Sequence, residues 1–195
     1  GGILNGTAHY VTDAEAATDL VVLAGGGPVV TLHHVPADAP GVEIRPVATM
    51  DPTRPLSEVS FTDVSATAIG APDDLVARVR DLVWALLAVE QVGAAGAALR
   101  MTVEYTKERK QFGRVIGSFQ ALKHRMADMY ADVETSRSIA YAAVEAIGTS
   151  EGAELAAAAH VYCSEAFGRV TGEAIQLHGG IGITWEHDIQ LYFKR

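Results

Sequence analysis

The sequence predicts an α+β protein in two parts. A partial β-barrel or β-sandwich over residues 1–72, incomplete at its N-terminus, precedes an antiparallel four-helix bundle over residues 73–195 whose last helix is truncated. All seven prolines lie at or before Pro72. Beyond Pro72, alanine becomes dominant and apolar residues recur every three or four positions, the period of a helix. The change in composition places the domain boundary near residues 70–73.

The first part reads as short strands joined by turns. Residues 20–23 and 29–32 are apolar, largely β-branched runs. Gly- and Pro-rich segments over residues 25–28 and 36–41 separate these runs from their neighbours, because both residue types favour turns.

The first helix of the second part is expected to begin at the acidic pair after Pro72 and to end near Phe112–Gly113. Its expected packed face consists of Val76, Val79, Val83, Leu86, Gly93, Gly96, Met101 and Tyr105.

Two further long helices and the start of a fourth are expected to follow. The second helix ends at Gly148, and its apolar stripe is Phe119, Leu122, Met126, Met129, Val133, Ala140, Val144 and Ile147. The third runs from about Glu151 to Gly179–Gly180, with Leu155, Ala159, Tyr162, Ala166, Val170, Ala174 and Leu177 on one face. The fourth spans Glu186–Arg195. A bundle cut off there would expose an apolar face, so we expect a longer native chain or a covering partner.

Composition argues against several functions. The 15 basic and 24 acidic residues give a net charge of -9, so general affinity for nucleic acid or an anionic membrane is not expected. The lone cysteine, Cys163, cannot form an intrachain disulfide or a cysteine zinc cluster, which favours a reducing, cytoplasmic location. No signal peptide or uninterrupted apolar span of about 18 residues is present.

Positive charge is concentrated in one segment of this acidic chain. Between Lys107 and Arg125 there are six basic residues and one acid, Glu108. This corner is a candidate site for a diphosphate, because arginine offers planar, two-pronged hydrogen bonding. Composition alone favours the alternative, a solvated basic face.

A glycine-rich turn follows the third helix. The segment Gln176–Gly182 reads QLHGGIG, and its glycines would let a phosphate, ribose or adenine approach the backbone. It is not a Rossmann fingerprint, because these glycines do not open a strand-to-helix turn. The pattern alone favours an ordinary helix end.

Other catalytic chemistries have weaker support. The adjacent His33 and His34 point to opposite faces of a strand, and His160, His178 and His187 lack a regular ligand spacing, so structural roles are favoured over a metal site. No Gly-x-Ser-x-Gly elbow of a hydrolase occurs. Glu90 lies among apolar residues and could act as a base if buried, although a carboxylate at the bundle edge or paired with an arginine is preferred.

Read together, these segments resemble the acyl-CoA dehydrogenase family. The resemblance rests on ERKQFGR at 108–114, IGSFQALKH at 116–124 and MADM at 126–129. The segment QLHGGIG at 176–182 is similar to the family's second cofactor motif, and NGTAHYVTDA at 5–14 looks like a strand of its middle β domain. The motifs follow the family's order and cover nearly the whole chain.

The resemblance implies FAD held between a middle β domain and a helical bundle. Tyr10 matches the aromatic residue beside the isoalloxazine ring, and Thr12 matches the residue near its N5 edge. The other matching cofactor contacts are Arg109, Gln111, Phe112 and Gln120, and, reaching FAD from a neighbouring subunit, Gln176, Gly179 and Gly180. A homo- or hetero-oligomer, a dimer or tetramer, is therefore implied.

The resemblance supplies no catalytic base within this chain. The family's N-terminal helical domain would precede Gly1, and its usual catalytic glutamate would lie just beyond Arg195. Some members carry the base on the first bundle helix, but Val83 occupies that position and Glu90 is two turns away.

The implied activity is α,β-dehydrogenation of an acyl-CoA thioester, with electrons passing to an electron-transfer flavoprotein. The alternatives are a catalytically silent subunit completing a partner's FAD site, or an acyl-CoA oxidase or flavin monooxygenase on the same scaffold. The acyl chain preferred is not readable from the sequence.

Overall fold

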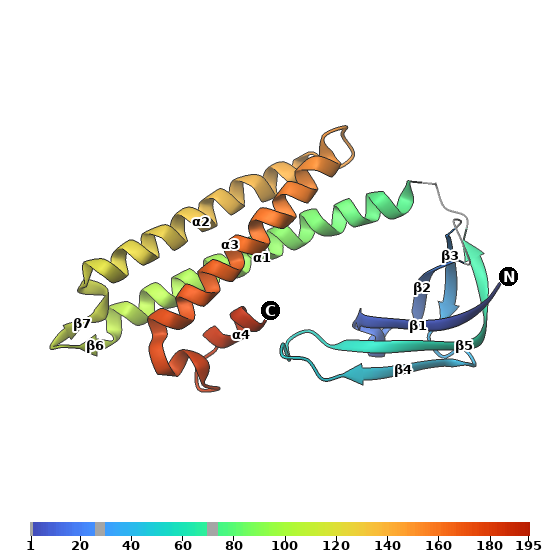
Figure 1. Cartoon of the computed structure of the whole chain (residues 1–195), viewed down its shortest axis with the longest axis horizontal. Helices are drawn as coiled ribbons and strands as arrows, with labels where there is room; N and C mark the ends of the chain where they lie inside the picture. The colour runs from blue at the N-terminus through green and yellow to red at the C-terminus, as the bar shows by residue number, and fades with distance from the viewer. Residues whose placement is uncertain (1, 26–29, 70–73) are drawn as a thin grey trace. The chain divides into compact units, whose positions relative to one another are not determined.

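The computed structural model describes residues 2–25, 30–69 and 74–195, which form a β unit within residues 1–73 and a helical unit over residues 74–194 (Figure 1). The sequence is therefore correctly assigned to the α+β class, with a curled antiparallel sheet followed by helices. The expected boundary near residues 70–73, the start of the first helix at Asp73 and most of the turn at 25–28 lie outside the described residues.

The β unit is one antiparallel sheet with a long strand at its centre. Its strands are β1 Gly2–Thr12, β2 Asp19–Ala24, β3 Thr31–Pro36, β4 Val42–Val47 and β5 Leu56–Ile69. The sheet order is β1-β5-β3-β2, and β4 also pairs with β5, on the side away from β1. Alternating apolar residues of these strands form one core that includes Leu4, Val35, Val59 and Val64.

The buried positions of β5 shift by one residue halfway along the strand. Ser57, Val59 and Phe61 are buried before the change, and Val64 and Ala66 after it. Asp63 lies at the change with a positive φ of 51°, where the β1–β5 register also shifts. The extra residue is a β-bulge, and it lets one strand serve both halves of the curled sheet.

The helical unit consists of three long helices and one short helix. These are α1 Leu75–Glu108, α2 Gln120–Glu145, α3 Gly152–His178 and α4 Ile189–Lys194. Two core clusters hold them together: one rich in alanine joins α1, α2 and α3, and a second, with larger side chains such as Met129 and Leu177, also takes in Ile189 of α4. The fourth helix is shorter than the expected residues 186–195, because bends and turns occupy residues 184–188 between a 3₁₀ turn, η3 (Gly179–Ile183), and α4.

The buried face of α1 differs from the expected one. Val76, Val79, Val83 and Leu86 are all between 45% and 53% exposed. Of the expected face, Gly96 is buried and Met101 packs against the core. The other buried positions of α1 are Ala85, Ala88, Val92, Ala95, Ala98, Leu99, Thr102 and Thr106. Small side chains let α1 approach its neighbours closely, so alanine rather than the larger aliphatic residues forms the contact.

By length and composition, α1 could also cross a membrane, and it is the one such helix in the described part of the chain. A core helix of a soluble protein has the same properties, so this observation is weak evidence for a membrane.

Candidate functional site

The basic corner of the helical unit is built on a β-hairpin. The helix α1 ends at Glu108, earlier than the expected Phe112–Gly113. Strands β6 (Lys110–Gln111) and β7 (Arg114–Val115) pair antiparallel around a two-residue turn. Phe112 and Gly113 have φ values of 55° and 77°, which are excluded from a right-handed helix and typical of a type I′ turn. The helix itself ends before Arg109, whose backbone is extended and leads into the hairpin.

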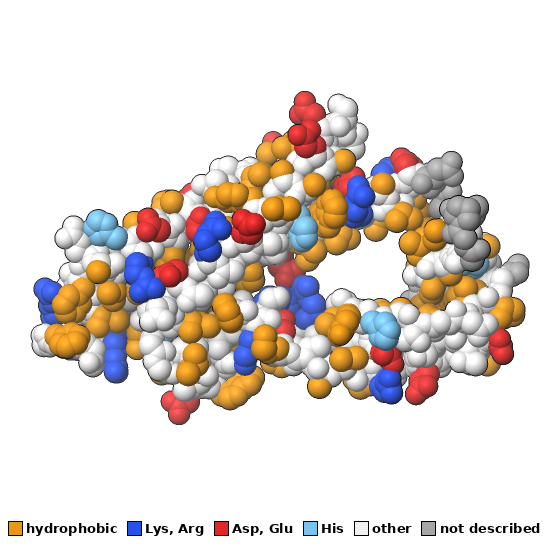
Figure 2. Space-filling view, viewed as in Figure 1, with side chains coloured by type: hydrophobic (Ala, Val, Ile, Leu, Met, Phe, Trp, Pro, Cys, Tyr) orange, Lys and Arg blue, Asp and Glu red, His pale blue; other side chains and the backbone are white. Residues whose placement is uncertain are grey.

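The hairpin presents cations that are not neutralised by neighbours. Within the described ranges, no carboxylate lies in ion-pair distance of Arg109, Lys110, Arg114 or Lys123. The Arg114 guanidinium lies 3.9 Å from the centre of the Phe119 ring, a cation–π contact. Figure 2 shows Lys and Arg side chains beside hydrophobic ones at this end of the helical unit. The corner therefore has the charge that an anionic ligand requires.

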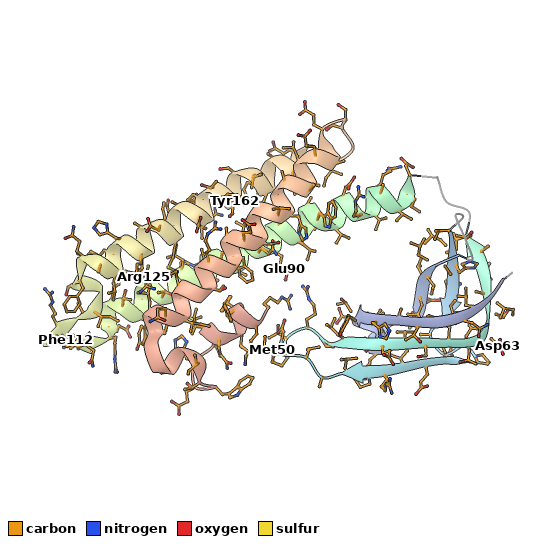
Figure 3. The ribbon with its side chains drawn as sticks, viewed as in Figure 1. Met50, Asp63, Glu90, Phe112, Arg125 and Tyr162 are labelled. Carbon is orange, nitrogen blue, oxygen red and sulfur yellow. The ribbon has the colours of Figure 1, made fainter. Side chains whose placement is uncertain are left out.

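The other predicted residues of this segment are also accessible. Phe112 is 91% exposed at the hairpin tip and its ring meets Phe119 edge-on, with centroids 6.1 Å apart (Figure 3). Gln111 is exposed on β6, and Gln120 is exposed in the first turn of α2. A ligand at this corner could thus meet a cation, an amide and an aromatic ring together.

The glycine-rich turn combines an exposed backbone with a buried histidine. Gln176, Gly179 and Gly180 are exposed, whereas His178 is only 3% exposed. Gly179 has a φ of 64° and ends α3, as the sequence predicts. A Cβ atom at Gly180 would meet no atom within 4 Å, so the space beside this backbone is open to a ligand.

Tyr105 joins the glycine turn to the basic corner. Its hydroxyl donates a 3.2 Å hydrogen bond to the His178 carbonyl, and its ring stacks on the His178 ring with centroids 4.4 Å apart. Its own carbonyl accepts a 2.9 Å hydrogen bond from the backbone N–H of Arg109. The sequence predicts Tyr105 only as a packed helix position. Its place four residues before Arg109, one helical turn, indicates that it lies near the basic corner. Its contact with His178, 73 positions later, cannot be predicted from the sequence.

The His178 ring lies in an environment that disfavours its charged form. Its Nδ1 lies 2.7 Å from the Ala174 carbonyl, which makes Nδ1 the protonated nitrogen. The Nε2 atom is buried without a hydrogen-bond partner. Burial lowers the pKa of His178, and the His187 ring, 4.5 Å away, adds to the effect. A structural role in the bundle, which the sequence favoured over metal binding for this histidine, agrees with this environment.

In the β unit, the predicted residues lie on β1. Tyr10 has a φ of 58° and is 69% exposed, at a register shift between Ala8 and Val11. A positive φ in a non-glycine strand residue is strained, and such strain accumulates at functional sites. The bulge turns the Tyr10 side chain away from the core, and Thr12 is exposed two residues later.

Neither the alternative base position nor Glu90 offers the buried carboxylate that a base requires. Val83 is 45% exposed and has no group that could accept a proton. Glu90 lies on the exposed side of α1 and has an interaction of its own, so it is not the buried carboxylate that the base hypothesis requires (Figure 3).

Comparison with known proteins identifies the chain's relatives. Residues 85–195 match the family described as acyl-CoA dehydrogenase, C-terminal domain. Acyl-CoA dehydrogenase IpdE2 of Mycobacterium tuberculosis is 45% identical over 186 residues, 95% of this chain and 53% of the relative. IpdE2 of Mycolicibacterium smegmatis is 50% identical over 151 residues, 77% of this chain and 45% of the relative. The chain thus spans about half the length of the curated relatives it matches.

Solved structures give the same grouping. The Tcur3481–Tcur3483 steroid ACAD variant has a TM-score of 0.88 at 34% identity, covering 98% of this chain and 52% of its own. A structure described as an electron-transferring flavoprotein of Acidaminococcus fermentans has a TM-score of 0.92 at 29% identity, with coverages of 98% and 54%. The ChsE4–ChsE5 complex of Mycobacterium tuberculosis has a TM-score of 0.87 at 28% identity, with coverages of 98% and 53%.

Proposed function

The chain belongs to the acyl-CoA dehydrogenase family, and on this premise we propose that the protein is an FAD-dependent dehydrogenase of acyl-CoA thioesters. The observation that carries the proposal is the basic β-hairpin, linked through Tyr105 to an open glycine turn. FAD bound in an oligomer would account for both features, because the hairpin would meet one cofactor and the turn that of a neighbouring subunit.

The residues present fit FAD. A diphosphate needs fixed cationic donors, and the corner offers Arg109 without a competing carboxylate in the described ranges. Exposed Phe112 and Tyr10 offer aromatic surface, and the open space beside Gly180 admits close approach to the backbone. These features support the residue roles implied by the resemblance.

In this proposal, Arg109 binds the FAD diphosphate, with Gln111 and Phe112 beside it and Gln120 toward the adenosine half. Tyr10 and Thr12 border the isoalloxazine ring, and Gln176, Gly179 and Gly180 serve the FAD of a neighbouring subunit. When bound, FAD accepts the hydride that leaves the substrate β carbon. A carboxylate takes the α proton, which the thioester carbonyl acidifies, and the electrons pass on to an electron-transfer flavoprotein.

The test is a substrate panel. The full-length protein should purify yellow, and its flavin absorbance should bleach anaerobically when the matching acyl-CoA is added, with reduction of a dye acceptor in turnover. The panel should include a steroid-type CoA thioester, because a relative at 34% identity is a steroid ACAD. A yellow protein that bleaches with none of the thioesters would contradict the proposed activity.

A second candidate function is a catalytically silent subunit that completes the FAD site of a partner chain. Val83 occupies the alternative base position, and two structural relatives are named for two different components. The complete gene sequence distinguishes the two candidate functions. A glutamate shortly after Arg195 favours the active enzyme. Absence of that glutamate, together with co-purification of a second dehydrogenase-like chain, favours the silent subunit.

Oxidase or monooxygenase chemistry on the same scaffold depends on how oxygen reaches the flavin. Oxygen uptake during turnover with a bleaching thioester would identify these activities, whereas strict dependence on a dye or flavoprotein acceptor would identify a dehydrogenase.

A further inference from the structure

We propose that Tyr105 is a positioning residue that fixes the glycine turn Gly179–Gly180 relative to the Arg109 corner. The proposal rests on the proposed function only where FAD is concerned, since the positioning itself is a property of this chain. Tyr105 belongs to neither the cofactor motifs nor the residues considered as a catalytic base.

The first step of the argument is that Tyr105 contacts both segments at their starting residues. His178, whose carbonyl accepts the Tyr105 hydroxyl, immediately precedes Gly179. Arg109, whose N–H bonds to the Tyr105 carbonyl, is the first residue after α1. The side chain of Tyr105 therefore holds the start of the turn against the same last turn of α1 that leads into Arg109.

The second step is that the stack gives the contact a fixed orientation. The Tyr105 and His178 rings are inclined by 23°, and the His187 ring meets the Tyr105 ring edge-on at 6.1 Å. His187 is itself held, because its Nδ1 accepts the Ile189 N–H at 3.1 Å. Three rings from α1, α3 and the segment before α4 thus enclose the start of the turn.

The third step is that the other hydrogen bonds of the turn stay within α3 and the turn itself. The Gly179 N–H donates to the Ile175 and Gln176 carbonyls. The end of the turn is closed separately, by the Thr184 hydroxyl and N–H bonding to the Ile181 carbonyl. Gly179 has a positive φ and no neighbour within 4 Å of its Cβ position. The beginning of the turn is therefore tied to α1 through Tyr105.

The experiment compares Tyr105→Phe with Tyr130→Phe in the full-length protein. Phenylalanine keeps the ring and removes one hydroxyl. Tyr130 is 59% exposed on α2 and serves as the matched control. Amide hydrogen exchange of residues 179–183 in the FAD-free protein should accelerate roughly three- to tenfold in Tyr105→Phe, the effect of one net hydrogen bond, while amides in the middle of α2 keep their rates. The dissociation constant for FAD should rise by a similar factor.

The outcomes separate the two proposals. Unchanged exchange at 179–183 would overturn the positioning role, and faster exchange with unchanged FAD affinity would overturn its relevance to the cofactor. If the wild type binds no FAD, the proposed function fails, and the exchange rates alone then test whether Tyr105 positions the turn. Should Tyr105→Phe fail to fold, His187→Leu tests the same ring cluster from its other side, and faster exchange at 179–183 is again expected.

Discussion

Two glycines of the same turn should respond oppositely to alanine. At Gly182, an added Cβ would lie 2.8 Å from the Ile175 carbonyl oxygen and 3.1 Å from the His178 Cβ. Ordinary contact begins near 3.5 Å, and a backbone oxygen at the end of α3 cannot rotate away. Gly182→Ala should therefore lower the free energy of unfolding by about 1–3 kcal/mol, the range for overpacking a tight site.

Gly180 provides the control within the turn. Its Cβ position is open and its φ is not positive, so alanine fits without strain. Gly180→Ala should leave stability unchanged or raise it by about 0.4–1 kcal/mol, because alanine reduces the freedom of the unfolded chain. The two variants change the same atom in the same 3₁₀ turn and differ only in what surrounds it.

Urea unfolding followed by circular dichroism, with the thermal midpoint as a second measure, decides between them. A change of 1 kcal/mol corresponds to about 2–4 °C in a chain of this size. Equal stability of Gly182→Ala and wild type, or equal losses in both variants, would refute the steric argument. If Gly180→Ala keeps its stability but loses FAD affinity, the open space at Gly180 serves the cofactor rather than the fold.

Further predictions concern the cofactor, the histidine and the core. Arg109→Ala should weaken FAD binding by about tenfold to a hundredfold, the value of a charge-assisted bond, and Lys110→Ala should have a smaller effect; equal titration of Arg109→Ala and wild type would disprove the diphosphate assignment. Burial lowers the pKa of His178 in the folded protein, so on acidification the unfolded chain takes up a proton on this residue before the folded protein does. The free energy of unfolding should therefore fall as pH drops below about 6.5, the ordinary pKa of histidine. Urea midpoints at several pH values should show a shallower fall in His178→Gln. Met129→Ala should cost about 2–5 kcal/mol, because Met129 is 2% exposed, whereas exposed Tyr130→Ala should cost far less; similar losses would contradict the observed burial.

The sequence by itself determined the features that depend on local composition. The disappearance of proline after Pro72 separates the β part from the helices, and the apolar period of α3 matches its buried residues closely, at Ala159, Ala166 and Val170. The concentration of lysine and arginine after α1 and the glycines after α3 are also visible in the sequence, because backbone preference and charge belong to single residues and their neighbours.

Only the tertiary structure decided which side of α1 is buried and what meets at the candidate site. Hydropathy ranks Val83 and Leu86 above alanine, yet Ala85 and Ala88 are buried, because burial depends on the shape of the helices that approach. The extended backbone of Arg109 ends α1 early and leads into a hairpin whose pairing involves residues on both sides of the Phe112 turn. The contact between Tyr105 and His178 joins residues 73 positions apart, and no local pattern encodes a contact that two packed helices create.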